Sequence, residues 1–218
     1  MPANHKVHFL KDMSQGFDKR QVDFHTISDW VTDGARVLDL GCGRGILLEH
    51  LKQTKQTMGV GVDLDPDKIL SCVKRGISAY QGDIEEILSR FDDAYFDWVI
   101  LSRTVQELNR PADILTEALR VGKRAVVGFA NYDFWVARRE VSVAVSAEGD
   151  HEAHIPNLLF DKPWYEANPI VPVSISGFEA FCAKRGKTIL RKTLFTEEGE
   201  PERMETNAAY ALYEISSR

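Results

Sequence analysis

Residues 36–45 read Arg-Val-Leu-Asp-Leu-Gly-Cys-Gly-Arg-Gly, and this stretch decides the fold. A short apolar run of the kind that forms a buried strand ends at Leu40, and glycines follow at every second position. Because glycine has no Cβ, the backbone of such a turn can pass close beneath a ligand. The dinucleotide-binding pattern is not met, since its third glycine would fall at Ile46, and no Gly-Lys-Ser/Thr of a phosphate-binding loop follows.

Three more apolar runs end in a polar residue farther along the chain. The first ends at Asp63, about 20 residues past the glycine turn, where doubly wound folds carry an acid that hydrogen-bonds a ribose diol. The second ends at Asp83, and the third, residues 96–102, ends at Ser102. Four signals in this order resemble the S-adenosylmethionine-dependent methyltransferases of the Rossmann-like class.

This resemblance implies S-adenosylmethionine as the cofactor and a set of residues that bind it: Asp39, Gly41, Cys42, Gly43, Gly45, Asp63, Leu64, Asp83, Ile84 and Ser102. The resemblance implies that the Asp39 carboxylate binds the methionine ammonium, directly or through water, and that Asp63 accepts hydrogen bonds from the ribose hydroxyls. It also implies that Asp83 accepts a hydrogen bond from the adenine amino group, with Ile84 packed on the ring. Each acid also has a structural alternative. Asp39 could tie down loop amides, Asp63 could cap the following helix, and Asp83 could belong to a simple turn.

Helical patterns alternate with these strands, which favours a parallel sheet with right-handed crossovers. We expect helices at about 21–32, from Ile46, from Asp65-Pro66 to Gly76, from Pro111, and through Phe178 to Gly186. A fifth strand is expected at 125–129. Two last strands, at about 188–195 and 208–215, follow in direct succession, so as neighbours they must pair antiparallel. The predicted fold is α/β: a Rossmann-like methyltransferase fold with a seven-stranded, mostly parallel sheet, one antiparallel strand and helices on both faces.

The composition fits one domain. The chain has 218 residues, of which 44% are hydrophobic, and a net charge of −6, which argues against binding to nucleic acid through its phosphates. We expect an N-terminal arm at 1–20 and a single domain at 21–218 with a lid insertion at about 131–172. Three widely spaced cysteines indicate packed apolar groups, and we expect no metal site, no membrane segment and a cytoplasmic location.

Within the methyltransferases, the chain resembles the methionine biosynthesis protein W family. The resemblance rests on 36–45, 72–76, 96–102, Thr104, Gln106, 119–123, 129–131, Trp135 and Trp164-Tyr165. It implies a role in methionine biosynthesis as an accessory of homoserine O-acetyltransferase. The chain departs from the family pattern at Arg103, where glutamine is usual, and at Val171, where histidine is usual. Both departures fall on the substrate or partner side.

The alternative is an active methyltransferase that acts on an unidentified small molecule. The sequence presents no catalytic base, so catalytic residues stay unknown; positioning alone can supply much of the acceleration of methyl transfer. Ser102 and Gln106 are candidate groups at the pocket edge. The aromatic residues of the lid could bind a substrate or a partner, or they could merely anchor the lid, and His154 is a candidate proton acceptor.

Overall fold

The computed structural model describes residues 22–138, 164 and 173–217. Its strands are β1 (Arg36–Leu40), β2 (Met58–Asp63), β3 (Ser78–Gln81), β4 (Phe96–Ser102), β5 (Gly122–Ala130), β6 (Lys187–Phe195), β7 (Pro201–Glu202) and β8 (Tyr210–Ser217). Its helices are α2 (Val22–Trp30), α3 (Ile46–Lys55), α4 (Pro66–Lys74), α5 (Ile84–Leu88), α6 (Pro111–Val121) and α8 (Ile175–Lys184), with 3-10 turns η1 (Val105–Glu107) and η3 (Glu205–Asn207).

The strands form one sheet in the order β3-β2-β1-β4-β5-β8-β6-β7. Strands β1 to β5 run parallel, and β8 lies antiparallel between β5 and β6. The order reverses between β1 and β4, because the chain first builds outward from β1 to β3 and then returns to β4. Open α/β sheets bind ligands beyond the carboxyl ends of the strands at such a reversal. The topology therefore singles out the ends of β1 and β4.

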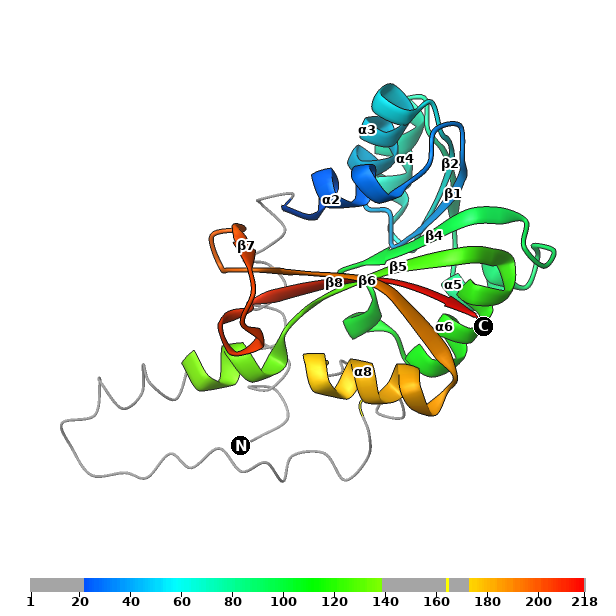
Figure 1. The fold of residues 1–218 in the computed structure, drawn as a ribbon. Coiled ribbons are helices and arrows are strands. Elements are labelled where there is room, and N and C mark those ends of the chain that lie inside the picture. The colour runs from blue at the N-terminus through cyan, green and yellow to red at the C-terminus, as the bar shows by residue number, and fades with distance from the viewer. Residues whose placement is uncertain (1–21, 139–163, 165–172, 218) are drawn as a thin grey trace, which may run out of the picture.

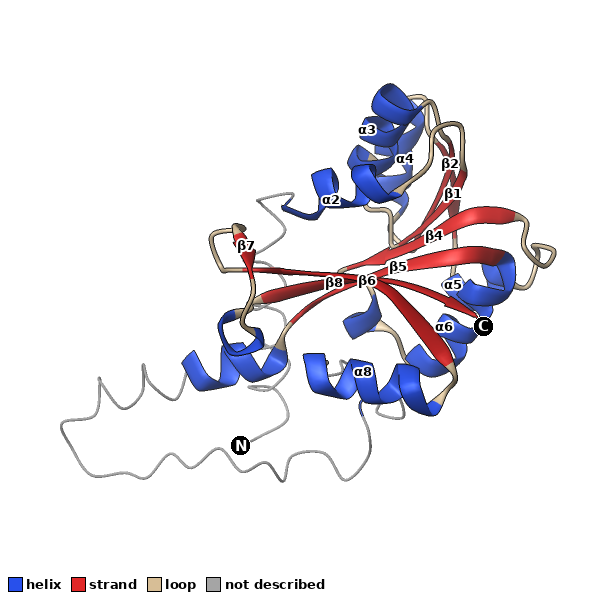
Figure 2. Cartoon of the chain, in the orientation of Figure 1, coloured by secondary structure: helices blue, strands red, loops and turns tan. Residues whose placement is uncertain are grey.

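Helices cover both faces of the sheet (Figures 1 and 2): α2, α3 and α4 lie on one face and α5, α6 and α8 on the other. Successive side chains of a strand point to opposite faces, so the buried residues divide into two clusters. On β8, for example, Leu212 joins the cluster under α2, α3 and α4, whereas Ala211 and Tyr213 join the cluster under α6 and α8. The predicted fold class is confirmed.

The predicted helix boundaries are close to those observed. Asp65 caps α4, accepting hydrogen bonds from the amides of Asp67 at 2.9 Å and Lys68 at 3.4 Å, and Pro66 occupies the first helical position. Gly76, just past α4, has a φ of +69°, as expected of a residue that ends a helix. The first helix is slightly shorter than predicted, because α2 stops at Trp30.

The predicted count of seven strands is wrong, because the acidic linker contains an eighth. A turn at residues 196–200, with Gly199 at a φ of +89°, folds Pro201–Glu202 back along the end of β6. This two-residue β7 has no alternating apolar pattern that could reveal it. Pro201 is tolerated there because an edge strand does not need every amide for pairing.

Part of the predicted domain plan lies outside the described residues: the arm at 1–20 and most of the lid, including Val171, His154 and Tyr165. Of the lid's aromatic residues, Trp135 donates its indole N–H to the carbonyl of Ala209 at 3.1 Å, and Trp164 donates to the carbonyl of Gly177 at 3.0 Å. These contacts tie Trp135 to the residue before β8 and Trp164 to α8.

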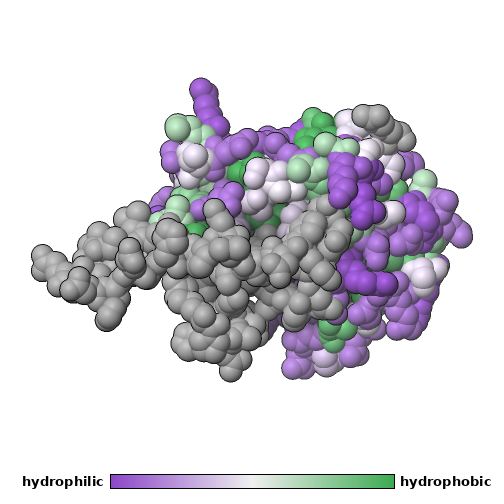
Figure 3. Space-filling view, turned by 90° about the horizontal axis from the view of Figure 1, so that it is seen from below, coloured by the Kyte–Doolittle hydropathy of each residue, from purple (hydrophilic) through white to green (hydrophobic). Residues whose placement is uncertain are grey.

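The described surface is mainly polar on the face shown in Figure 3, with apolar side chains in small separate patches. In the described residues, no helix combines the length and apolar character needed to cross a bilayer. The same residues bring together no group of three or more His, Cys, Asp or Glu side chains suited to a metal ion.

Candidate functional site

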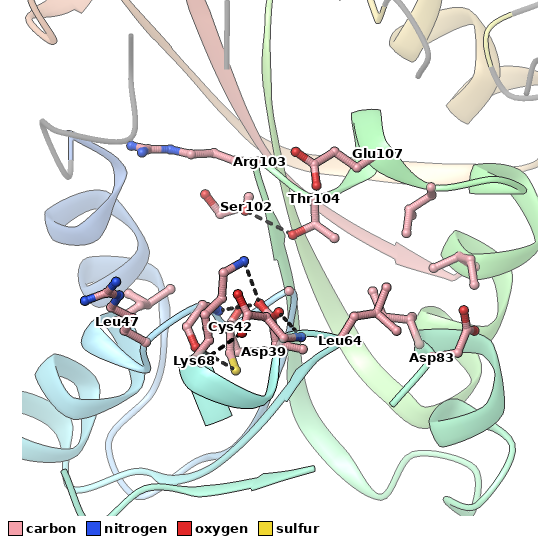
Figure 4. A pocket seen from close by; sticks show the side chains of 18 of the residues that line it. Asp39, Cys42, Leu47, Leu64, Lys68, Asp83, Ser102, Arg103, Thr104 and Glu107 are labelled. Atoms are coloured by element: carbon pink, nitrogen blue, oxygen red, sulfur yellow. Dashed lines mark hydrogen bonds and ion pairs between the residues drawn. The ribbon is translucent and has the colours of Figure 1, made fainter. Parts of the chain in front are cut away.

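A pocket of about 680 Å³ opens at the carboxyl ends of β1, β2 and β4, where the strand order reverses. Figure 4 shows Cys42, Asp39 and Lys68 gathered on one side of this pocket and Ser102, Thr104 and Glu107 across from them. The turn after β1 supplies one wall, and the residues that follow β4 supply another. Residues far apart in the sequence thus meet at the place that the topology selects.

The glycine turn adopts a backbone that other residues avoid. Gly41, Gly43 and Gly45 have φ values of +78°, +55° and +74°, all in the left-handed region. At Gly41 a Cβ would lie 2.3 Å from Oγ1 of Thr104, which donates a hydrogen bond to the carbonyl of Leu40 at 2.8 Å. Gly41 is therefore required both by its backbone angle and by the close approach of the residues after β4.

The Asp63 carboxylate at the end of β2 holds the glycine turn in place. It accepts hydrogen bonds from the amides of Gly43 and Asp65, both at 3.0 Å, and it forms an ion pair with Lys68 at 3.5 Å. A carboxylate can accept about four hydrogen bonds. Since its ion pair with the 44% exposed Lys68 is long, Asp63 retains acceptor capacity for ligand hydroxyls while it holds the glycine turn; the predicted alternative of a helix cap is filled by Asp65 instead.

Asp39 is a buried acid without a partner among the described residues. Its side chain lies at the pocket, is only 4% exposed, and contacts no hydrogen-bond donor or cation among the described residues. Burial, followed by the negative charges of Asp23 and Asp63, raises the pKa of Asp39 to about 7. Because an unpaired buried carboxylate is costly, this position favours a cationic ligand that would pair with it.

The adenine end of the predicted site lies beyond β2 and β3. Leu64 is 67% exposed and lines the pocket with Asp83 and Ile84. The Asp83 carboxylate accepts a hydrogen bond from the amide of Glu85 at 2.8 Å and so caps α5. Asp83 thus has a structural role as a helix cap and not as part of a simple turn, and the single amide leaves acceptor capacity on its two oxygens.

A polar cluster joins α2 to the sheet at the other end of the pocket. The buried carboxylate of Asp23 accepts hydrogen bonds from the hydroxyl of Ser102, from Arg103 at 3.1 Å and from the hydroxyl of Tyr210 at 3.4 Å. Arg103 also lies over the Tyr210 ring and has a φ of +64°, uncommon for a residue other than glycine. Ser102 and Arg103 both line the pocket.

The charge of the pocket fits a cation. Seven acidic and four basic residues line it: Asp23, Asp39, Asp63, Asp65, Asp83, Glu85 and Glu107 against Arg44, Lys68, Arg103 and Arg110. S-adenosylmethionine carries an ammonium, a sulfonium and one carboxylate, so its net charge is positive. The acidic lining and Asp39, which has no partner among the described residues, suit a ligand of net positive charge, and the glycine turn allows a close approach.

The structure brings nine of the ten predicted cofactor residues to the pocket; Gly45 supports the turn from behind, next to Cys72. Gln106 differs from the expectation, because its amide bonds the backbone N–H and C=O of Ala130 and not the pocket. Sequence reasoning missed Asp23, Lys68 and Glu107. Asp23 could have been considered, since it lies in the helix that was expected at about 21–32.

The fold is that of the Rossmann-like methyltransferases. An S-adenosylmethionine-dependent methyltransferase from Thermotoga maritima superposes with a TM-score of 0.62 at 15% identity, covering 97% of both chains. Magnesium protoporphyrin IX methyltransferase from Synechocystis PCC 6803, with S-adenosylhomocysteine bound, superposes with a TM-score of 0.60 at 13% identity, covering 94% of this chain and 84% of that one. At such identities the likeness establishes the fold.

The family is established by sequence. Residues 21–215 match the model of the family described as methionine biosynthesis protein MetW, and the chain belongs to this family. A curated relative, the bifunctional methionine biosynthesis protein MetXA/MetW of Rhodopirellula baltica, is 35% identical over 121 residues, which are 52% of this chain. The match spans only 19% of that longer relative.

Proposed function

We propose that the pocket binds S-adenosylmethionine. The observation that carries this proposal is Asp39: a buried carboxylate, unpaired within the described residues, at the end of the strand that leads into the glycine turn. A ligand with a positive group at that point offsets the cost of its charge. Neither a nucleotide phosphate nor a plain sugar supplies such a group.

The other contacts follow from the arrangement of the walls. The ammonium group pairs with Asp39, and the ribose hydroxyls bond Asp63. The adenine ring lies against Leu64 and Ile84, with its amino group toward Asp83. The remaining proposed contacts are the turn residues Gly41, Cys42, Gly43 and Gly45, together with Ser102.

For the wider role, we propose an accessory protein of methionine biosynthesis that acts on homoserine O-acetyltransferase. Membership of the MetW family and the existence of a relative that joins MetXA and MetW in one chain support this assignment. Fusion in one polypeptide is typical of proteins that work together. The proposed location is the cytoplasm, on the compositional grounds given above.

A second candidate function is methyl transfer to a small molecule. It is favoured by the lining of the pocket beyond the proposed cofactor residues, where Arg103 and Glu107 add polar groups outside the contacts assigned to the cofactor. The two functions separate experimentally, because only a methyltransferase releases S-adenosylhomocysteine when a suitable acceptor is present.

Replacing Asp63 by alanine is expected to weaken S-adenosylmethionine binding about tenfold, which is about 1.4 kcal/mol, because charge-assisted bonds to the ribose are lost. Thermal unfolding with and without ligand measures this: at about 100 times the dissociation constant, the ligand stabilises the wild type by about 2.7 kcal/mol. Asp67→Ala is the matched control, since Asp67 is an exposed acid nearby on α4 and does not line the pocket. Equal ligand-induced shifts in the Asp63 and Asp67 variants would refute the assignment.

The accessory role predicts that the purified protein alters the rate of a homoserine O-acetyltransferase from the same source. The acetylation rate is followed with increasing amounts of this protein until both are saturating. The wild type and the Asp63→Ala variant are compared, to show whether the effect on the acetylation rate requires a ligand in the pocket. A rate that stays constant throughout would rule out the accessory role and leave the methyltransferase candidate.

A further inference from the structure

Two cysteine thiols meet directly beneath the glycine turn. Cys42 belongs to the turn and lines the pocket, whereas Cys72 lies on α4; their sulfur atoms are 3.9 Å apart although 30 residues separate them. Cys72 is fully buried and Cys42 is 8% exposed. Both occur as free thiols, and the third cysteine, Cys182, lies on α8 in the cluster on the opposite face.

The two thiols are packed into space left by glycines. A Cβ at Gly61 would lie 2.5 Å from the sulfur of Cys42, and a Cβ at Gly45 would lie 2.9 Å from the sulfur of Cys72. The neighbouring backbone thus lets both sulfur atoms approach each other. A disulfide needs a separation of about 2 Å, so the sulfur atoms must move closer by a little under 2 Å.

Gly43 connects this pair to the proposed ribose acid. Its carbonyl accepts weak hydrogen bonds from both thiols, at 3.3 Å from Cys72 and 3.7 Å from Cys42, and its amide donates to Asp63 at 3.0 Å. Oxidation removes both S–H donors and draws Cys42, the residue next to Gly43, toward α4. The amide that holds Asp63 moves with it.

We propose that Cys42 and Cys72 form a reversible disulfide that lowers the affinity of the pocket for its ligand. The claim that the disulfide lowers ligand affinity rests on the proposed binding of S-adenosylmethionine. The claim that the disulfide forms depends on the two thiols alone. The oxidant is a peroxide that reaches Cys42 from the pocket.

The chemistry balances in two steps. The Cys42 thiol gives up its proton and attacks hydrogen peroxide, forming a sulfenic acid and releasing water. The Cys72 sulfur then attacks the Cys42 sulfur, and a second water leaves as the disulfide forms. Burial raises the pKa of both thiols, so the reaction is expected to be slow at neutral pH and faster in alkaline buffer.

Linkage requires that ligand and disulfide oppose each other. If the disulfide weakens ligand binding by a given factor, the ligand disfavours the disulfide by the same factor at equilibrium. A bound ligand also covers Cys42, the thiol through which the oxidant enters. Saturating S-adenosylmethionine is therefore expected to slow oxidation.

The test is to treat the reduced full-length protein with hydrogen peroxide, unfold it, alkylate the remaining thiols and map the peptides by mass spectrometry. We expect a linked Cys42–Cys72 peptide and alkylation of Cys182 alone. Calorimetric titration with S-adenosylmethionine should show affinity about tenfold weaker after oxidation, restored by dithiothreitol. C72S should give no linked peptide, whereas C182S should give the linked peptide and the dithiothreitol-reversible loss of affinity seen in the wild type.

Alkylation of all three cysteines after peroxide treatment would overturn the proposal, as would a linked peptide in a protein of unchanged affinity. The result also separates this inference from the proposed function. If the reduced wild type binds no S-adenosylmethionine, the proposed function fails, and with it the claim about affinity, while the peptide map still decides whether the disulfide forms.

Discussion

An Asp39→Asn variant is expected to be more stable than the wild type at pH 8 and yet to bind S-adenosylmethionine about a hundredfold more weakly. The gain arises because asparagine carries no charge to bury. Burial, with the charges of Asp23 and Asp63, raises the pKa of Asp39 from 3.8 to about 7, so keeping it ionised costs about 2 to 4 kcal/mol. The loss arises because the ligand ammonium no longer meets a carboxylate, about 2.7 kcal/mol.

The pH dependence has a definite sign. The folded protein prefers the protonated form of Asp39, so the stability that this residue contributes falls as pH rises from about 4 to about 7 and is level above that. The stability advantage of the asparagine variant should accordingly be full above pH 7 and vanish toward pH 4. Affinity for a cationic ligand should rise through pH 7 in the wild type and stay level in the variant.

Urea denaturation and calorimetric titration at pH 6, 7 and 8 measure both effects. Asp29→Asn is the matched control, because Asp29 is exposed on α2 and does not line the pocket. Should Asp39→Asn lower stability at pH 8, the carboxylate must have a partner that stabilises it, and the structural alternative for Asp39 would hold. An unchanged affinity would remove Asp39 from the binding site.

A Gly41→Ala variant is expected to lose about 3 kcal/mol of unfolding free energy. About 1 kcal/mol comes from placing a Cβ on a residue with a φ of +78°, and about 2 kcal/mol from the clash with Thr104, whose Oγ1 would lie 2.3 Å away. Thr104 cannot easily yield, since it is buried and its hydroxyl bonds the carbonyl of Leu40. Urea denaturation measures the loss.

Gly34→Ala separates the two contributions. Gly34 has a φ of +69°, but a Cβ there would meet no atom within 4 Å. We expect this variant to lose only about 1 kcal/mol. Equal losses of unfolding free energy in the Gly34 and Gly41 variants would show that Thr104 does not contact Gly41 as closely as the structure places it.

Local signals in the sequence predict most of the fold. Asp65-Pro66 begins α4 and Gly76 follows its end because capping and positive φ depend on a few neighbouring residues. Strand ends at Asp63 and Ser102 were equally visible, since a polar residue closes each apolar run. The eighth strand escaped prediction because its pairing depends on a turn geometry and not on a pattern.

The candidate site could be predicted only in part. Its glycines and acids follow strand ends, which meet at one edge of any parallel sheet. Asp23 reaches Tyr210 across 187 positions of sequence, and such a contact depends on how α2 packs. Gln106 shows the converse, since a polar residue near a strand end turned toward Ala130 to satisfy buried backbone groups. The pairing of Cys42 with Cys72 was likewise set by tertiary packing.

The most direct test of the central claim is calorimetric titration of S-adenosylmethionine into the reduced wild-type protein at pH 8, where Asp39 is mainly ionised. We expect a single site, competed by S-adenosylhomocysteine and weakened about a hundredfold by Asp39→Asn. A folded wild-type protein that binds neither compound would contradict the account, and the pocket would then have to serve another cation.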